Sequence, residues 1–162
     1  MNGNSKKNYF YFAFIVLIFA ADRVTKIIIL NIFKTSDFTS IKINSFLNFS
    51  LVWNDGIAFG LFSLEKNFYY NILTSIILLI TIFIIFMGYR ASNMFEKLSY
   101  FMIAGGASGN IFDRLYYSSV VDFIDITIAN FHWFIFNVAD IFITLGIVIL
   151  LSREFVNKKK YE

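Results

Sequence analysis

Two aspartates in this sequence stand in apolar surroundings, where an ionised carboxylate is costly. Asp140 lies inside "FIFNVADIFITLGIVILL" (residues 134–151), a run about long enough to cross a bilayer. Placing an ionised aspartate in hydrocarbon costs at least ~2.5 kcal/mol, so such residues usually face a cavity, a partner or a substrate. Asp122 lies just before this run, in "SSVVDFID" (residues 118–125). Both carboxylates are therefore candidates for a functional site.

The chemistry open to this pair depends on the two carboxylates meeting. Neither Asp122 nor Asp140 has a basic residue within one helical turn along the chain. Two carboxylates that share a site lose their protons in separate steps, so one stays protonated while the other is ionised. The ionised member can then activate water while the protonated member polarises a carbonyl, as in an aspartic protease. Asn137, three residues before Asp140, lies on the same helical face.

Other interpretations of the pair remain open. Asp122 could cap a helix while Asp140 bonds a neighbouring backbone group, and both would then have only structural roles. A small carrier or channel could use paired intramembrane carboxylates to move protons or cations. The carboxylates gather near one membrane face and the chain shows no internal repeat, which favours an enzyme over a carrier. A scaffold without activity would not need two acids that lack cations.

The composition indicates the kind of protein that must position these residues. The chain has 162 residues, is 58% hydrophobic, has a mean hydropathy of +0.68 and contains neither cysteine nor proline, which is typical of a small integral membrane protein. Without cysteine there is no disulfide, thiolate nucleophile or lipid-acceptor thiol. A single histidine, His132, argues against zinc, which takes several His or Cys ligands, and we interpret His132 as an interfacial residue. The net charge of +3 is not gathered with aromatic residues into a nucleic-acid-binding surface.

Apolar segments predict an all-α membrane protein with a bundle of four transmembrane helices. The third segment is short, but Gly105 and Gly109 would let neighbouring helices approach closely. Basic residues flank the segments in a pattern that places both termini in the cytoplasm. The first segment lacks a small-x-small cleavage site, so we expect an uncleaved anchor. The predicted spans are residues 9–30, 68–88, 98–112 and 134–151 of a single domain, 1–162.

The remaining segments, 31–67 and 113–133, are expected on the outer side of the membrane. "FTSIKINSFLNFSLVW" (38–53) partly alternates and is rich in β-branched and aromatic residues, and the turn-like "NDG" (54–56) follows it. This pattern predicts a small β-ribbon at the membrane surface. The apolar "IAFGLF" (57–62) is expected to pack on the bundle or to contact lipid or a lipid-bearing substrate.

Further polar residues are predicted to face the interior of the bundle. Asp22 and Lys26 are four residues apart, in the favourable orientation for a helical ion pair. A polar stripe on the third segment could provide hydrogen bonds between helices. It comprises Gly106, Asn110, Asp113 and Arg114 of "GGASGNIFDR" (105–114).

Five blocks, taken in order, resemble the lipoprotein signal peptidase (signal peptidase II) family. The resemblance spans nearly the whole chain, and its specificity comes from the order, spacing and membrane placement of the blocks. Two departures concern the outer loop, where Ser118 replaces a glycine and Phe134 a proline that are common in the family. The blocks are "DRVTK" (22–26), "WNDGIAFG" (53–60), "GGASGNIFDR" (105–114), "VVDFID" (120–125) and "FNVAD" (136–140).

This resemblance implies an aspartic endopeptidase of the bacterial cell (inner) membrane, with a small extracytoplasmic β-cradle. It would cleave the signal peptide of a prolipoprotein immediately before a diacylglyceryl-modified cysteine, without a cofactor or metal. The implied catalytic residues are Asp140 and Asp122, the latter in preference to Asp125. The expected partners are lipidated prolipoproteins and membrane lipid, not nucleic acid, and the chain is expected to act as a monomer. The implied supporting residues are Asp22, Lys26, Asn54, Gly56, Asn110, Asp113, Arg114 and Asn137.

Overall fold

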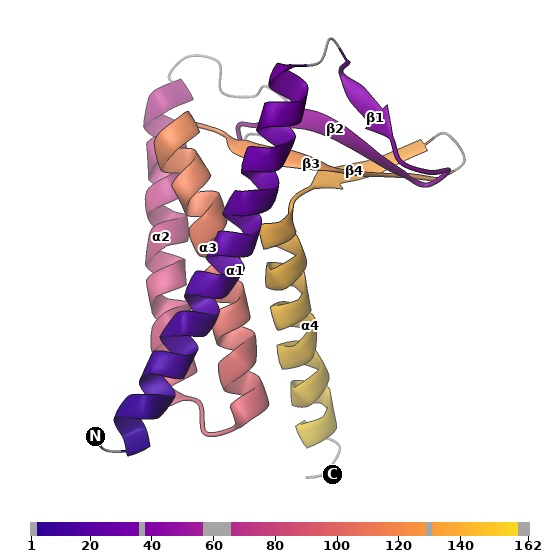
Figure 1. Ribbon diagram of the computed structural model, residues 1–162. Coiled ribbons are helices and arrows are strands. Elements are labelled where there is room, and N and C mark those ends of the chain that lie inside the picture. The colour runs from indigo at the N-terminus through magenta and orange to yellow at the C-terminus, as the bar shows by residue number, and fades with distance from the viewer. Residues whose placement is uncertain (1–2, 36–37, 57–65, 129–130, 159–162) are drawn as a thin grey trace.

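The computed structural model describes residues 3–35, 38–56, 66–128 and 131–158. In these residues four helices form a bundle, and an antiparallel sheet lies at one end of it (Figure 1). Helix α1 begins and helix α4 ends at the opposite end of the bundle (Figure 1). The elements are α1 (Gly3–Lys34), β1 (Ser40–Lys42), β2 (Leu47–Asn54), α2 (Lys66–Arg90), α3 (Met94–Tyr117), β3 (Val120–Ile128), β4 (Phe131–Phe136) and α4 (Val138–Lys158).

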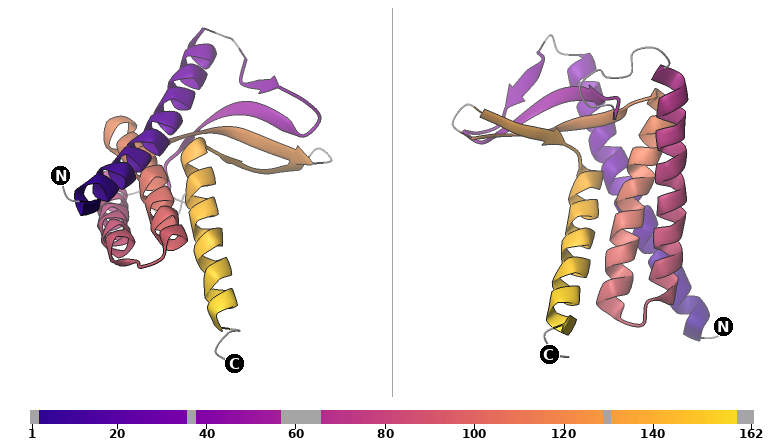
Figure 2. Two further views of the ribbon diagram at one scale, coloured as in Figure 1. Left: turned by 60° about the horizontal axis from the view of Figure 1, so that its bottom comes forward. Right: turned by 180° about the vertical axis from the view of Figure 1, so that it is seen from behind.

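The sheet is larger than the sequence predicted. Its order is β1-β2-β3-β4 with antiparallel pairing throughout, and it projects sideways from the bundle (Figure 2). The predicted ribbon is confirmed in β1 and β2, but β3 and β4 were not predicted to be strands. In the β2–β3 pair Val52 lies opposite Asp122, so the sheet carries this carboxylate to the edge of the bundle.

The predicted fourth span was wrong at its start. Residues Phe134–Phe136 belong to β4, and the helix begins only at Val138. The helix begins there because Asn137 and Asp140 cap it reciprocally: Asn137 Oδ1 accepts the Asp140 N–H at 3.1 Å, and Asp140 Oδ2 accepts the Asn137 N–H at 3.1 Å. Asp140 therefore lies in the first turn of α4, beside the sheet, and not two turns inside an apolar helix.

Helix α3 is the central helix and packs against α1, α2 and α4. The predicted close approach at its glycines is confirmed on the side that faces α1. A Cβ atom at Gly105 would lie 2.9 Å from Ile18 Cβ, and one at Gly109 would lie 2.5 Å from Asp22 Oδ2. The missing side chains thus allow α1 to bring its charged residues against α3.

The distribution of side chains is the reverse of that in a soluble protein. Asp22, Lys26 and Asp113 are fully buried, while large apolar side chains such as Leu17 and Leu79 are exposed along the helices. By length and composition, one helix among the described residues, Phe68–Arg90, is long and apolar enough to cross a membrane. The exposed apolar surfaces are those expected of helices that face lipid.

Candidate active site

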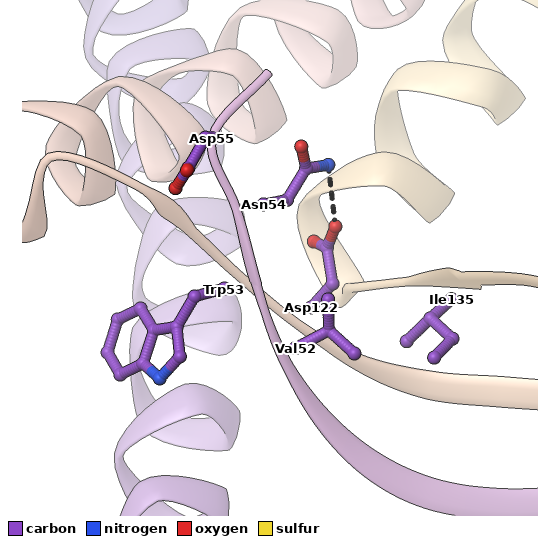
Figure 3. Close-up of a pocket in the computed structure, with 6 residues that line it drawn as sticks. All are labelled: Val52, Trp53, Asn54, Asp55, Asp122 and Ile135. Atoms are coloured by element: carbon purple, nitrogen blue, oxygen red, sulfur yellow. Dashed lines mark hydrogen bonds between the residues drawn. The ribbon is translucent and has the colours of Figure 1, made fainter. Parts of the chain in front are cut away.

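Both oxygens of Asp122 accept hydrogen bonds from asparagine amides. Asn54 Nδ2 donates to Asp122 Oδ2 at 2.9 Å (Figure 3). Asn137 Nδ2 donates to Asp122 Oδ1 at 2.6 Å. The Asn54 amide is fixed in this orientation because its Oδ1 accepts the N–H of Gly56 at 2.8 Å. Gly56 has a positive φ of 70°, a conformation that favours glycine, so the predicted turn at residues 54–56 is confirmed.

Asp140 is held in a similar way from two sides. Its Oδ2 accepts the backbone N–H of Asn137, and its Oδ1 accepts a hydrogen bond from Asn110 Nδ2 at 2.8 Å. Asn110 is oriented in turn by Lys26, whose Nζ donates to Asn110 Oδ1 at 3.1 Å. Within the described part of the chain each carboxylate therefore accepts two hydrogen bonds, and the donors are Asn54 of β2, Asn110 of α3 and Asn137, which lies between β4 and α4.

Asn137 connects the two carboxylates directly. Its side-chain amide donates to Asp122, while its backbone N–H donates to Asp140. The structure thus brings the two aspartates predicted to form a pair to the same residue. Asp125, the alternative along the same strand, is buried in the sheet and accepts hydrogen bonds from Ser50 (3.1 Å) and Thr127 (3.4 Å).

The surroundings of Asp122 favour its protonated form. Burial raises the pKa of the Asp122 carboxyl, because it penalises the charged form. The hydrogen bonds from Asn54 and Asn137 lower this pKa, the charge of Asp140 raises it and Lys26 lowers it, and the net direction is upward. A raised pKa is what the proton-carrying member of a carboxylate pair requires.

A buried cluster of four charges lies behind the pair. Lys26 Nζ lies 3.0 Å from Asp22 Oδ2, which confirms the predicted pair within α1, and 2.6 Å from Asp113 Oδ2 on α3. Arg23 completes the cluster with ion pairs to Asp22 (3.0 Å) and Asp113 (2.6 Å). The cations of Asp113 therefore come from α1, and not from its sequence neighbour Arg114.

Both carboxylates of this cluster also bind backbone groups next to the aspartate pair. Asp113 Oδ2 accepts the N–H of Val121 at 3.2 Å, and Asp22 Oδ1 accepts the N–H of Ala139 at 3.1 Å. Val121 immediately precedes Asp122, and Ala139 immediately precedes Asp140. The cluster thus fixes the chain one residue before each member of the pair.

A pocket of about 440 Å³ opens beside Asp122 at the edge of the sheet (Figure 3). Its wall combines apolar side chains with the carboxylate and amide just described. Arg114 is nearby, since its Nη2 would lie 3.5 Å from a Cβ atom at Gly56, and its buried Nε has no hydrogen-bond partner among the described residues. The lining residues are Val52, Trp53, Asn54, Asp55, Asp122 and Ile135.

Sequence reasoning missed Arg23 and Tyr70. The hydroxyl of Tyr70 on α2 is buried without a hydrogen-bond partner among the described residues, and nothing in the apolar run around it singles it out. Arg23 did carry a signal, because an arginine within a predicted span is as costly as Asp140. The "IAFGLF" segment, for which we expected a role at the bundle or with lipid, lies outside the described residues.

A solved structure described as a bacterial membrane enzyme is similar to this fold. The TM-score is 0.72 at 27% sequence identity, and the match covers 94% of this chain and 91% of the other. A second solved bacterial membrane enzyme has a TM-score of 0.68 at 28% identity, over 88% and 90% of the two chains. The chain is therefore a membrane protein built on the fold of these enzymes.

The family follows from the sequence comparisons. The model of the family described as signal peptidase (SPase) II matches residues 14–156. A lipoprotein signal peptidase of Pelagibacter ubique is 47% identical over 97% of this chain and 95% of its own length. One from Francisella tularensis subsp. novicida is 39% identical, over 93% and 94%. The chain belongs to the signal peptidase II family and is a peptidase, as the sequence blocks predicted.

Proposed function

We propose that this peptidase removes signal peptides from prolipoproteins by cleaving immediately before a diacylglyceryl-modified cysteine, with Asp122 and Asp140 as its catalytic pair. The observation that carries the proposal is the position of Asn137, which donates one hydrogen bond to each carboxylate. The relatives named lipoprotein signal peptidase support the substrate class. The pocket beside Asp122 provides the place for the peptide bond.

The two aspartates have different roles in this proposal. Asp140 lies in the first turn of α4, where the positive end of the helix dipole stabilises a negative charge, so we assign it the ionised state. Asp122, whose pKa is raised by burial, carries the shared proton. Asp140 takes a proton from a water molecule as that water attacks the scissile carbonyl, and Asp122 gives its proton to the carbonyl oxygen.

Collapse of the tetrahedral intermediate restores the pair. Asp140 passes the proton that it took from water to the leaving nitrogen, while Asp122 recovers a proton from the hydroxyl that becomes the new carboxyl. Arg114 is a further donor for the substrate backbone or the developing oxyanion, because its buried Nε has no hydrogen-bond partner among the described residues. The reaction uses only water, and no cofactor or metal is proposed.

In the proposed membrane arrangement four helices span the bilayer, both termini are cytoplasmic and the sheet lies at the outer surface. Support comes from the shared end at which α1 begins and α4 ends, opposite the sheet (Figure 1). Exposed aromatic residues on the strands, such as Trp53 and Trp133, would contact lipid headgroups. We also propose that the chain acts as a monomer.

This arrangement can be tested with single cysteines, because the chain has none. Thr39→Cys, just before β1, and Ser92→Cys, between α2 and α3, both replace exposed residues. A membrane-impermeant thiol reagent applied to intact cells should label only the cysteine at Thr39. Labelling only at Ser92 would overturn the orientation, and labelling at both positions would overturn the four-span arrangement.

The function itself can be tested with two peptides of one sequence that differ only in the diacylglyceryl group on the cysteine. The purified protein in lipid or detergent should cleave the lipidated peptide, and mass spectrometry should find the lipidated cysteine at the new N-terminus. Cleavage at another bond, or equal cleavage of the peptide without lipid, would contradict the proposed specificity. Absence of cleavage together with ion flux in proteoliposomes would support a carrier instead.

A further inference from the structure

Arg23 of α1 forms an ion pair that joins α1 to α3 in the interior of the bundle. Its side chain is 10% exposed, and its two terminal nitrogens bind different carboxylates: Nη1 lies 2.6 Å from Asp113 Oδ1 on α3, and Nη2 lies 3.0 Å from Asp22 Oδ2 on α1. The guanidinium carbon also lies 4.8 Å from the ring centre of Phe112. Arg23 thus contacts the two carboxylates with two separate nitrogens of its planar guanidinium, whereas Lys26 contacts both with its single Nζ.

Charge balance gives Arg23 a specific effect. Lys26 alone cannot neutralise both carboxylates, so the cluster without Arg23 would have a net charge of −1. Among the described residues, Arg23 provides the only ion pair or hydrogen bond to Asp113 Oδ1. Removing one partner from a buried ion pair leaves an uncompensated charge, which is far more disruptive than losing a pair at the surface. Arg23 therefore keeps the cluster neutral.

The cluster controls where the two aspartates of the proposed pair lie. Asp113 binds the backbone N–H just before Asp122, and Asp22 binds the N–H just before Asp140. Arg23 forms ion pairs with both of these carboxylates. It therefore links the hydrogen bond that fixes the backbone before Asp122 to the one that fixes the backbone before Asp140, 18 residues later in the sequence. It is not among the residues that line the pocket.

We infer that Arg23 is a positioning residue that holds Asp122 and Asp140 in register and keeps the charge beside them balanced. This inference rests on the proposed catalytic pair. It predicts a change in the pH dependence of cleavage as well as in its rate. The charged or titratable groups around the pair are Asp22, Arg23 and Lys26 on α1, Tyr70 on α2, Asp113 and Arg114 on α3, and Asp55 after β2.

The variant Arg23→Gln tests the charge directly. A negative charge left behind the pair disfavours ionisation of both aspartates, so both limbs of the bell-shaped pH profile should move to higher pH. A unit charge acting over about 10 Å at an effective dielectric constant near 20 shifts a carboxyl by about one pH unit. At the optimum pH of the unsubstituted protein kcat should fall up to about tenfold, while KM should change less than about twofold.

Arg153→Gln provides the matched control. Arg153 is near the far end of α4, and its Nε lies 3.6 Å from a carboxylate oxygen of Glu96 in a partly exposed ion pair. The same substitution there should leave both limbs and kcat unchanged, because exposed pairs contribute little. A folded Arg23→Gln protein with unshifted limbs would overturn the inference, whether kcat is lowered or not, since a purely structural role lowers kcat without moving the limbs.

A second variant covers the case in which Arg23→Gln does not fold. Arg23→Gln/Asp113→Asn removes one charge of each sign, so the cluster is again neutral, and it should fold with its limbs at the positions of the unsubstituted protein. Shifted limbs, or failure to fold, would contradict the charge-balance argument. The proposed function is tested separately, because it fails only if the unsubstituted protein does not cleave the lipidated peptide or if the aspartate pair proves dispensable.

Discussion

Replacement of Asn137 should affect stability and catalysis through two separable hydrogen bonds. Its Oδ1 caps α4 by accepting the Asp140 N–H, and its Nδ2 donates to Asp122 at 2.6 Å. Loss of such a cap costs about 1 kcal/mol. Loss of the Asn137 amide leaves a buried carboxyl oxygen of Asp122 without this donor, which costs about 1 to 3 kcal/mol. Because Asn137 is fully buried, Asn137→Ala should lower the free energy of unfolding by roughly 2 to 4 kcal/mol.

The rate follows from the second bond alone. If the about 1 to 3 kcal/mol of the bond to Asp122 is lost from the transition state, kcat/KM should fall by about 5- to 150-fold. Asn137→Ser separates the two effects, because serine caps a helix but cannot reach Asp122 with an amide. Serine should recover about 1 kcal/mol of stability relative to alanine while kcat/KM stays low. Full activity in the serine variant, measured with the lipidated peptide beside thermal unfolding, would refute the bridging role.

Two further predictions concern the pKa of Asp122 and the packing behind Asp140. Because the Asn54 hydrogen bond lowers the pKa of Asp122, Asn54→Ala should raise it and move the high-pH limb of the pH–kcat/KM profile upward; an unmoved limb would contradict the assignment of the proton. A Cβ atom at Gly106 would lie 2.5 Å from the backbone oxygen of Ala139, so Gly106→Ala should destabilise the protein by about 1 to 3 kcal/mol and reduce cleavage. Gly88→Ala is the control: a Cβ atom there meets only side chains at 3.1 Å, so this variant should keep its activity. If Gly106→Ala and Gly88→Ala lost thermal stability and cleavage activity equally, a special role for the α3–α4 contact would be contradicted.

The sequence predicted which polar residues lie together better than it predicted the backbone that carries them. Asp122 and Asp140 were singled out because uncompensated acids in apolar segments are costly, and in the structure both accept a hydrogen bond from Asn137. The start of α4 was not predicted, because "FIF" at residues 134–136 is as apolar as the helix that follows, and hydropathy alone does not distinguish a strand from a helix. The feature of the sequence that marks this boundary is the three-residue spacing of Asn137 and Asp140, which cap the start of the helix reciprocally.

Long-range partners were the second gap. Asp113 is adjacent to Arg114 in sequence, yet its cations come from α1, about 90 residues earlier. Helical periodicity shows which face a residue occupies, but not which helix lies opposite. Arg23 lies beside Asp22 in sequence, and only the packing of α1 against α3 shows that it also binds Asp113.

The central claim is that Asp122 and Asp140 together perform the cleavage, and the most direct test is the rate of cleavage of the lipidated peptide by three single variants. Asp122→Asn and Asp140→Asn should each abolish cleavage, because asparagine keeps the size but can neither share nor accept the proton. Asp125→Asn, on the same strand as Asp122, should retain substantial activity in protein shown by thermal unfolding to be folded. Normal cleavage by either Asp122→Asn or Asp140→Asn would contradict the account, as would an inactive but folded Asp125→Asn beside an active Asp122→Asn.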